Sequence, residues 1–274
     1  MRPIDRRSGL GTIGLLAAAG VIASSGCVSA LREPPPLEEI AADARAAGAG
    51  RFAEADQSWN RRTLESVHLA ANRYQAAVTD ESVQLEALLG ATRCRLWIAD
   101  HSEDPEERLS QAVEAINLAQ WCGRVAPEEV ECDYLLALGL GLQGRERRST
   151  AIDALPKVVS LLQSAIELAP RMDNAGPHRV LALVYMRAPG WPTGPGDIDL
   201  GYEQARLAVQ LDAGHPPNQM ALGEAHRELD EIDKSHAAYA EAERLAIERV
   251  EQNVPDAQEW LDRARRALER LEQR

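Results

Sequence analysis

The stretch from His178 to Ala242, HRVLALVYMRAPGWPTGPGDIDLGYEQARLAVQLDAGHPPNQMALGEAHRELDEIDKSHAAYAEA, decides the fold. It divides into two helical hairpins that meet at Gly214–Pro217. On the first helix of the second hairpin stands the pair Leu222-Gly223, and on the second helix stands Ser235-x3-Tyr239-x2-Ala242. Residues at these spacings share one helix face. The stretch therefore predicts antiparallel helices that approach closely at small residues.

The same small-x3-large-x2-Ala spacing recurs along the chain. Five of the instances are Ala70/Tyr74/Ala77, Ala112/Ile116/Ala119, Val158/Leu162/Ala165, Gly201/Ala205/Ala208 and Ser235/Tyr239/Ala242. Matching pairs on the preceding helices are Leu89-Gly90, Leu138-Gly139, Leu181-Ala182 and Leu222-Gly223. The pattern resembles the tetratricopeptide repeat (TPR), although only the last interval between alanines, 34 residues, equals the TPR period.

We therefore predict an all-α fold, a TPR-like superhelix of about five antiparallel helix hairpins plus a C-terminal capping helix. The first hairpin is degenerate and combines residues 38–60 with 63–78. Residues 144–150 read as a charged connector, with Pro156 in the first turn of the next helix. The final helix, 256–274, has one apolar side, and its charged side is interpreted as the solvent-facing surface of the cap.

Composition and charge limit the classes of partner. The chain has 274 residues with one Phe, five Trp and five Tyr, which suits closely packed helices better than a sheet. The formal net charge is −13. A body of this charge repels phosphate backbones, so nucleic acid is not expected as a partner.

The first residues predict export. Arg2, Arg6 and Arg7 precede an apolar run that ends in Ser24-Ser25-Gly26-Cys27, too short to form a stable membrane span. The end of the run resembles the lipobox of bacterial lipoproteins, in which the cysteine carries the lipid. We expect a lipoprotein signal peptide over 1–26, a lipidated Cys27 with a proline-rich tether over 27–37, and a TPR-like helical domain over 38–274. The alternative is an ordinary cleaved signal in which Cys27 is incidental.

Two of the other cysteines are expected to pair. Cys122 ends one helix and Cys132 begins the next, so in an exported protein a disulfide would clamp this corner. Two free thiols remain the alternative, since spacing does not fix Cα geometry. Cys94 lies on a helical face and is interpreted as a buried small residue.

No motif predicts catalysis, a cofactor or a metal site. The six histidines include no pair at i,i+4 with a carboxylate partner, and no serine stands in a G-x-S-x-G elbow. We expect a non-enzymatic protein with no catalytic residue, no metal ligand and no cofactor.

Trp191 is the residue selected for binding. Within Pro189-Gly190-Trp191-Pro192 it cannot belong to a regular helix, so a large apolar ring stands on a loop. Either the ring anchors a partner at a groove or interface, or it folds back into its own hairpin. Tyr185 would line the same groove, with core packing as its alternative.

The chain from about residue 128 to 246 also resembles the TatT component family of TRAP transporters. The residues that carry this resemblance are Ala154-Leu155-Pro156, Ala165 to Pro170, Gly176 to Tyr185, Arg187 to Pro192, Gly196-Asp197 and Pro216-Pro217-Asn218. The resemblance implies a periplasmic TPR-like lipoprotein with a ligand groove or pore, self-association as a homo-oligomer, and a periplasmic solute-binding protein as partner.

Two functions follow as hypotheses. The first is an accessory component of a TRAP-type solute uptake system that binds an apolar or carboxylate solute, the solute-binding protein, or both. The second is a general cell-envelope scaffold that gathers other envelope proteins. Both place the protein in the bacterial cell envelope, lipid-anchored at the periplasmic face of the outer membrane.

Overall fold

The structure, a computed structural model, describes residues 31–46 and 52–273, and within these ranges it contains helices and no β-strand. The helices are α1 (Leu37–Ala46), a 3-10 turn η1 (Phe52–Glu54), α2 (Ala55–Trp59), α3 (Leu64–Gln75), α4 (Gln84–His101), α5 (Pro105–Val125), α6 (Val130–Glu146), α7 (Arg148–Leu168), α8 (Met172–Arg187), α9 (Ile198–Leu211), α10 (Pro216–Glu228), α11 (Ile232–Glu251) and α12 (Ala257–Glu272).

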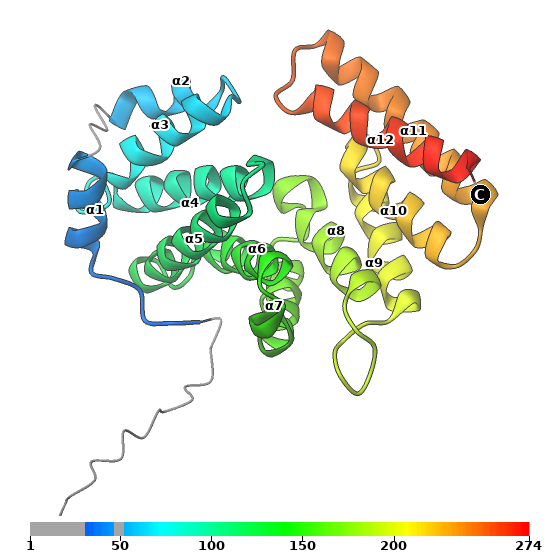
Figure 1. Ribbon diagram of the computed structural model, residues 1–274, viewed down its shortest axis with the longest axis horizontal. Helices are drawn as coiled ribbons and strands as arrows, with labels where there is room; N and C mark the ends of the chain where they lie inside the picture. The colour runs from blue at the N-terminus through cyan, green and yellow to red at the C-terminus, as the bar shows by residue number, and fades with distance from the viewer. Residues whose placement is uncertain (1–30, 47–51, 274) are drawn as a thin grey trace, which may run out of the picture.

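The helices form a solenoid of antiparallel hairpins (Figure 1). The hairpins are α2/α3, α4/α5, α6/α7, α8/α9 and α10/α11, and each packs on the next. Helix α12 covers the end of the array by packing on α11, with Leu261, Ala264 and Leu271 buried. The predicted all-α superhelix with five hairpins and a C-terminal capping helix is confirmed.

Paired helices come closest where a glycine on one helix lies beside a large side chain on the other. A Cβ on Gly90 of α4 would stand 2.7 Å from the ring of Tyr74 in α3, and one on Gly223 of α10 would stand 3.0 Å from the ring of Tyr239 in α11. Gly139 of α6 faces Ile116 of α5 in the same way, at 2.9 Å. The large residue of the repeated pattern therefore fills the space that a missing Cβ leaves.

The described part of the predicted tether lies against the helical body. Pro34 is buried, the carbonyl of Pro35 accepts a 2.7 Å hydrogen bond from the indole of Trp121, and Glu33 pairs with Arg124 at 2.7 Å. Residues 31–36 thus run along α5 before α1 begins. The predicted signal peptide and Cys27 lie outside the described residues.

The prediction for the connector between the third pair of helices was wrong. Residues 144–150 are not a loop, because α6 runs to Glu146 and α7 begins at Arg148, eight residues before Pro156. The charged side chains act within the fold. Glu146 accepts two hydrogen bonds from Arg108, at 2.7 and 2.9 Å, and Arg145 donates to the carbonyl of Ala99. The charged residues of 144–150 suggest a solvent-exposed connector when the sequence is considered locally, because their partners in the fold lie far away in sequence.

Cys122 and Cys132 are joined across the α5–α6 corner in the structure, with their Cα atoms 5.4 Å apart. Both residues are buried. Cys94, on α4, is a buried free thiol whose pKa burial raises to about 12, so it resists modification at neutral pH.

No helix in the described ranges has both the length and the apolar character that a bilayer crossing requires.

Two glycines allow a matched test of the packing argument. Gly90→Ala should destabilise the protein by about 1–3 kcal/mol, because Tyr74 is buried and hydrogen-bonded to Asp56 and cannot move away. Gly141→Ala, where a Cβ would meet nothing within 4 Å, should stabilise α6 by up to about 1 kcal/mol. Urea unfolding of both variants measures the difference. Equal effects at the two positions would contradict the packing argument.

Removing the α5–α6 crosslink should weaken the fold. The loop between Cys122 and Cys132 is short, so Cys122→Ala with Cys132→Ala should lose about 3 kcal/mol of unfolding free energy by the chain-entropy estimate. Thermal unfolding with and without dithiothreitol checks this. Wild type should lose stability on reduction, and the double variant should not respond.

Candidate functional site: a cationic groove

A groove of about 560 Å³ lies among the helices of the last two hairpins and the capping helix. One wall is α8, the floor comes from α10 and α11, and the other wall is α12. Helix periodicity accounts for the lining. Arg179, Leu183 and Arg187 recur every four residues on α8, and Arg263, Arg266 and Arg270 recur at intervals of three and four on α12.

The groove is positively charged although the chain is acidic. Five arginines line it, against two carboxylates, those of Asp173 and Glu224. The net charge of the whole chain is −13, so the sign of the groove is opposite to that of the rest of the protein. Clefts lined by one sign of charge concentrate ligands of the other sign.

The α8 wall presents arginines that are already fixed. Arg187 makes a two-pronged contact with Glu224 of α10, at 2.8 and 2.6 Å, and this contact raises the pKa of Arg187. Arg179 pairs with Asp173 at 2.8 Å and donates to Asn218 Oδ1 at 2.9 Å. The two carboxylates therefore fix the positions of these arginines and neutralise part of the positive charge of this wall.

Asn218 holds Arg179 in place. Its side chain is fully buried, and its amide nitrogen donates to the carbonyls of Asn174, Asp212 and Ala208 at 2.9, 2.9 and 3.2 Å. Only its oxygen remains to accept from Arg179. This small polar network joins the start of α8 to the start of α10.

The α12 wall presents arginines that are free to bind. Arg263 is 3.4 Å from Glu259, whereas Arg266 and Arg270 have no hydrogen-bond or ion-pair partner among the described residues. Arg263 and Arg270 are seven residues apart, roughly 10 Å along the helix axis. A ligand with several carboxylates could contact more than one of them.

Apolar and aromatic groups lie between the two walls. Met220, Tyr239 and Trp260 line the floor and one end, and His215 meets the ring of Trp260 edge-on at a centroid distance of 5.1 Å. Burial lowers the pKa of His215 to about 4, so it is neutral at physiological pH. The groove therefore suits an extended ligand that is both acidic and partly apolar.

The sequence alone did not indicate this site. The pattern of the final helix predicts a cap whose charged side faces solvent, whereas in the structure Arg263, Arg266 and Arg270 line the groove. The signal was present in the arginine spacing of the final helix and of α8. Nothing in the sequence showed that the two helices face each other.

Trp191 does not line this groove. It is 90% exposed on the loop between α8 and α9, which extends from the body in Figure 1, and Pro189 and Pro192 beside it are also exposed. The loop is held internally, since Gly196 N donates to the Pro189 carbonyl and Asp197 N to the Tyr185 carbonyl, at 2.8 and 2.9 Å. The tryptophan is thus presented to solvent and is not folded back into its hairpin.

Of the two roles considered for Tyr185, core packing is the one observed, and Tyr185 does not share a groove with Trp191. Tyr185 is only 8% exposed and belongs to the main apolar core. Its hydroxyl accepts from Gln163 of α7 at 3.5 Å. The physical reason is its helical position, which faces the preceding hairpin and not the loop that carries Trp191.

A second cavity, of about 220 Å³, lies between α1, α3, α4 and α5. Its charged base is Arg95, whose guanidinium donates to Gln75, Gln111 and Asn72 and pairs with Glu114 at 2.9 Å. The donors of this buried arginine are therefore used within the fold. We interpret this cavity as structural.

A solved structure of a TPR protein agrees with the fold. The crystal structure of TTC0263, a thermophilic TPR protein from Thermus thermophilus, is similar with a TM-score of 0.58 and 20% identity, covering 78% of this chain and 96% of that one. The crystal structure of the MamA protein gives a TM-score of 0.44 and 15% identity, covering 78% and 92%. No protein-family model and no curated protein sequence matches the chain.

Trp191 should contribute nothing to stability. Because its ring is exposed, Trp191→Ala should change the unfolding free energy by less than about 0.5 kcal/mol. Trp97→Ala is the comparison, since that ring stacks on His101 at 3.8 Å and donates to Asp256, and it should be clearly destabilising. Differential scanning calorimetry of both variants measures this. A large loss for Trp191→Ala would show that the ring is buried in solution.

Proposed function

We propose that the protein is a non-enzymatic TPR-like scaffold that binds an acidic segment of a partner protein in the cationic groove. The observation that carries the proposal is the groove itself, a positive surface built from α8, α10 and α12 of an acidic chain. The helical solenoid provides the concave side on which repeat proteins of this architecture bind extended ligands.

The charge pattern of the groove explains why the ligand should be acidic. The α8 arginines are held by Asp173 and Glu224, whereas Arg266 and Arg270 on the facing wall are exposed and lack a described partner. Carboxylates are the groups that arginine binds with two parallel hydrogen bonds. Trp260 and Met220 add apolar contact between the charged walls.

We propose no catalysis at this site. Both of its carboxylates are engaged by arginine, and His215 is neutral and packed against Trp260. These groups hold the walls in place. Among the described residues of the groove, none is a nucleophile with a general base beside it to activate it. Binding is the function that this arrangement supports.

We further propose that the scaffold acts in the bacterial cell envelope, with Cys27 as its lipid attachment and the periplasmic face of the outer membrane as its location. The support comes from the sequence of residues 1–27 and from the corner crosslinked by Cys122 and Cys132. Disulfides of this kind persist in oxidising compartments.

A second candidate is an accessory role in a TRAP-type solute uptake system. Its specific support is the Pro189–Pro192 loop, which carries part of the TatT resemblance and holds Trp191 exposed as an anchor for a periplasmic solute-binding protein. In this case the groove would take a carboxylate solute or an acidic segment of that protein, and self-association would be part of the assembly.

Charge reversal in the groove tests the proposal. Arg266→Glu with Arg270→Glu should weaken binding of a fluorescein-labelled, glutamate-rich twelve-residue peptide by about tenfold or more, because two attractive contacts become repulsive. Fluorescence anisotropy at low and at physiological salt measures the affinity, which should fall as salt rises.

The matched control is Arg206→Glu, an exposed arginine of α9 that does not line the groove. It should bind the peptide as wild type does. Equal losses for the control and the double variant would mean that the peptide senses overall charge, and the groove would not be the binding site.

A further inference from the structure

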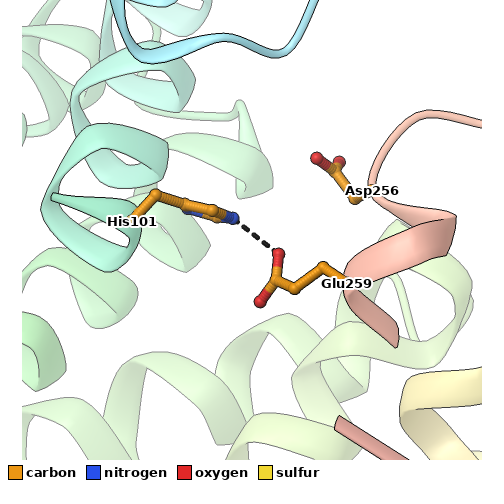
Figure 2. A group of neighbouring side chains, drawn as sticks. All are labelled: His101, Asp256 and Glu259. Atoms are coloured by element: carbon orange, nitrogen blue, oxygen red, sulfur yellow. Dashed lines mark hydrogen bonds and ion pairs between the residues drawn. The ribbon is translucent and has the colours of Figure 1, made fainter. Parts of the chain in front are cut away.

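The two ends of the solenoid meet at a polar seam. Asp256, just before α12, accepts from Arg62 Nε at 3.0 Å and from Trp97 Nε1 at 3.1 Å, and Glu259 of α12 lies 2.7 Å from His101 Nε2 (Figure 2). These partners are 158 to 194 residues apart in sequence. In Figure 1 the loop before α12 lies opposite the turn before α3.

No shared apolar core supports this seam among the described residues. The apolar cluster that contains α12 residues is built from α10, α11 and α12, and the main cluster extends from Leu31 to Tyr185 without reaching α12. Polar contacts therefore hold the seam together. A closure of this kind depends on the charge state of its groups.

The hydrogen bonds of His101 define its charge. Its Nδ1 lies 2.7 Å from the carbonyl of Trp97, which can only accept, so Nδ1 carries a proton. A neutral ring would then direct the lone pair of Nε2 at the Glu259 carboxylate. A proton on Nε2 turns this repulsion into a charge-assisted hydrogen bond. The stacked ring of Trp97 holds the imidazole in position.

The charges around His101 come from each element packed against it. Glu259 and Asp256 are the acids across the seam, Asp100 is its neighbour on α4, and Arg62 and Arg263 are the nearby cations. Burial lowers the pKa of His101, but the hydrogen bond and charge of Glu259, the hydrogen bond to the Trp97 carbonyl and the charge of Asp100 together raise it more, so the net shift is upward. The bond to His101 also lowers the pKa of Glu259.

A proton suits this cluster better than a metal ion does. One ligand atom from each of His101, Asp256 and Glu259 can lie within 4.8 Å of the others, which is a plausible donor set for a divalent cation. Arg62 already neutralises Asp256, however, and Arg263 lies beside Glu259. A divalent cation would place one more positive charge there than a protonated imidazole does.

We propose that His101 and Glu259, with the contacts of Arg62 and Trp97 to Asp256, form a proton-dependent clasp that controls access to the cationic groove. The proposal rests on the groove function proposed above. Glu259 directly precedes Trp260 of the groove, and Arg263 links the two by pairing with Glu259 while lining the groove. The closed clasp fixes the start of α12, which carries Trp260 and Arg263 of the groove, and its opening frees this wall to move away from α8 so that a partner segment enters.

The direction of the pH effect follows from the raised pKa of His101. The stabilising contribution of the clasp is complete below the ordinary histidine pKa of about 6.5 and is lost as the pH rises through the higher folded value. The clasp is thus closed in mild acid and opens in mild alkali.

A distance measurement tests the clasp without a ligand. Spin labels on Arg61→Cys and Gln258→Cys, two exposed positions on either side of the seam, report its width in a Cys27→Ser background. The distance distribution should be narrow at about pH 5.5 and broader and longer at about pH 8.5, on either side of the ordinary histidine pKa. His101→Gln should show the open distribution at both pH values.

The matched control is His68→Gln, which removes another histidine–glutamate contact, the 3.0 Å pair with Glu107. It should behave as wild type. A distance that ignores pH, or that changes with pH in His101→Gln as in wild type, would overturn the proposal. Opening by EDTA at both pH values would show that a metal ion joins the seam, and this result would overturn it too.

Binding kinetics test the link to the groove. Association and dissociation of the glutamate-rich peptide should both be about fivefold faster in His101→Gln than in wild type at mildly acidic pH, the scale of one ion pair. Unchanged rates with a pH-dependent distance would overturn the gating role. A peptide that binds at no pH would contradict the groove function, while the distance measurement would still decide whether the clasp exists.

Discussion

The closeness of the helices is the constraint on which the rest of the structure depends. Gly90, Gly139 and Gly223 leave space that Tyr74, Ile116 and Tyr239 fill, so the helix axes approach where a larger residue would separate them. The curvature of the array follows from the sum of such contacts. The groove and the seam both exist because this curvature brings α12 back toward earlier helices.

Charge is distributed unevenly on this frame. This acidic chain concentrates arginines on the walls of its groove. Carboxylates fix the arginines of α8, whereas Arg266 and Arg270 of α12 have no partner among the described residues. Buried Asn218 donates its amide hydrogens to backbone carbonyls and keeps its oxygen for Arg179. A groove that attracts acidic ligands is thus built into a body that repels them, which favours binding at one place.

The two ends of the solenoid are joined differently from its neighbouring hairpins. Neighbouring hairpins share apolar cores, whereas the seam between α4 and α12 consists of ion pairs and hydrogen bonds. Polar contacts at a seam can open at little cost while the apolar cores on either side stay intact. This difference allows one region of a rigid solenoid to respond to its surroundings.

The sequence by itself determined the hairpins, because the small-large-alanine spacing records which helix face is buried, and it placed Trp191 on a loop through the prolines and glycine around it. Only the tertiary structure decided that Tyr185 is core, that residues 144–150 are largely helical, and that Arg263 faces Arg187 across a groove. The physical reason is that periodicity reports the environment of one helix at a time. Contacts between residues more than 70 positions apart depend on the accumulated curvature of every hairpin between them.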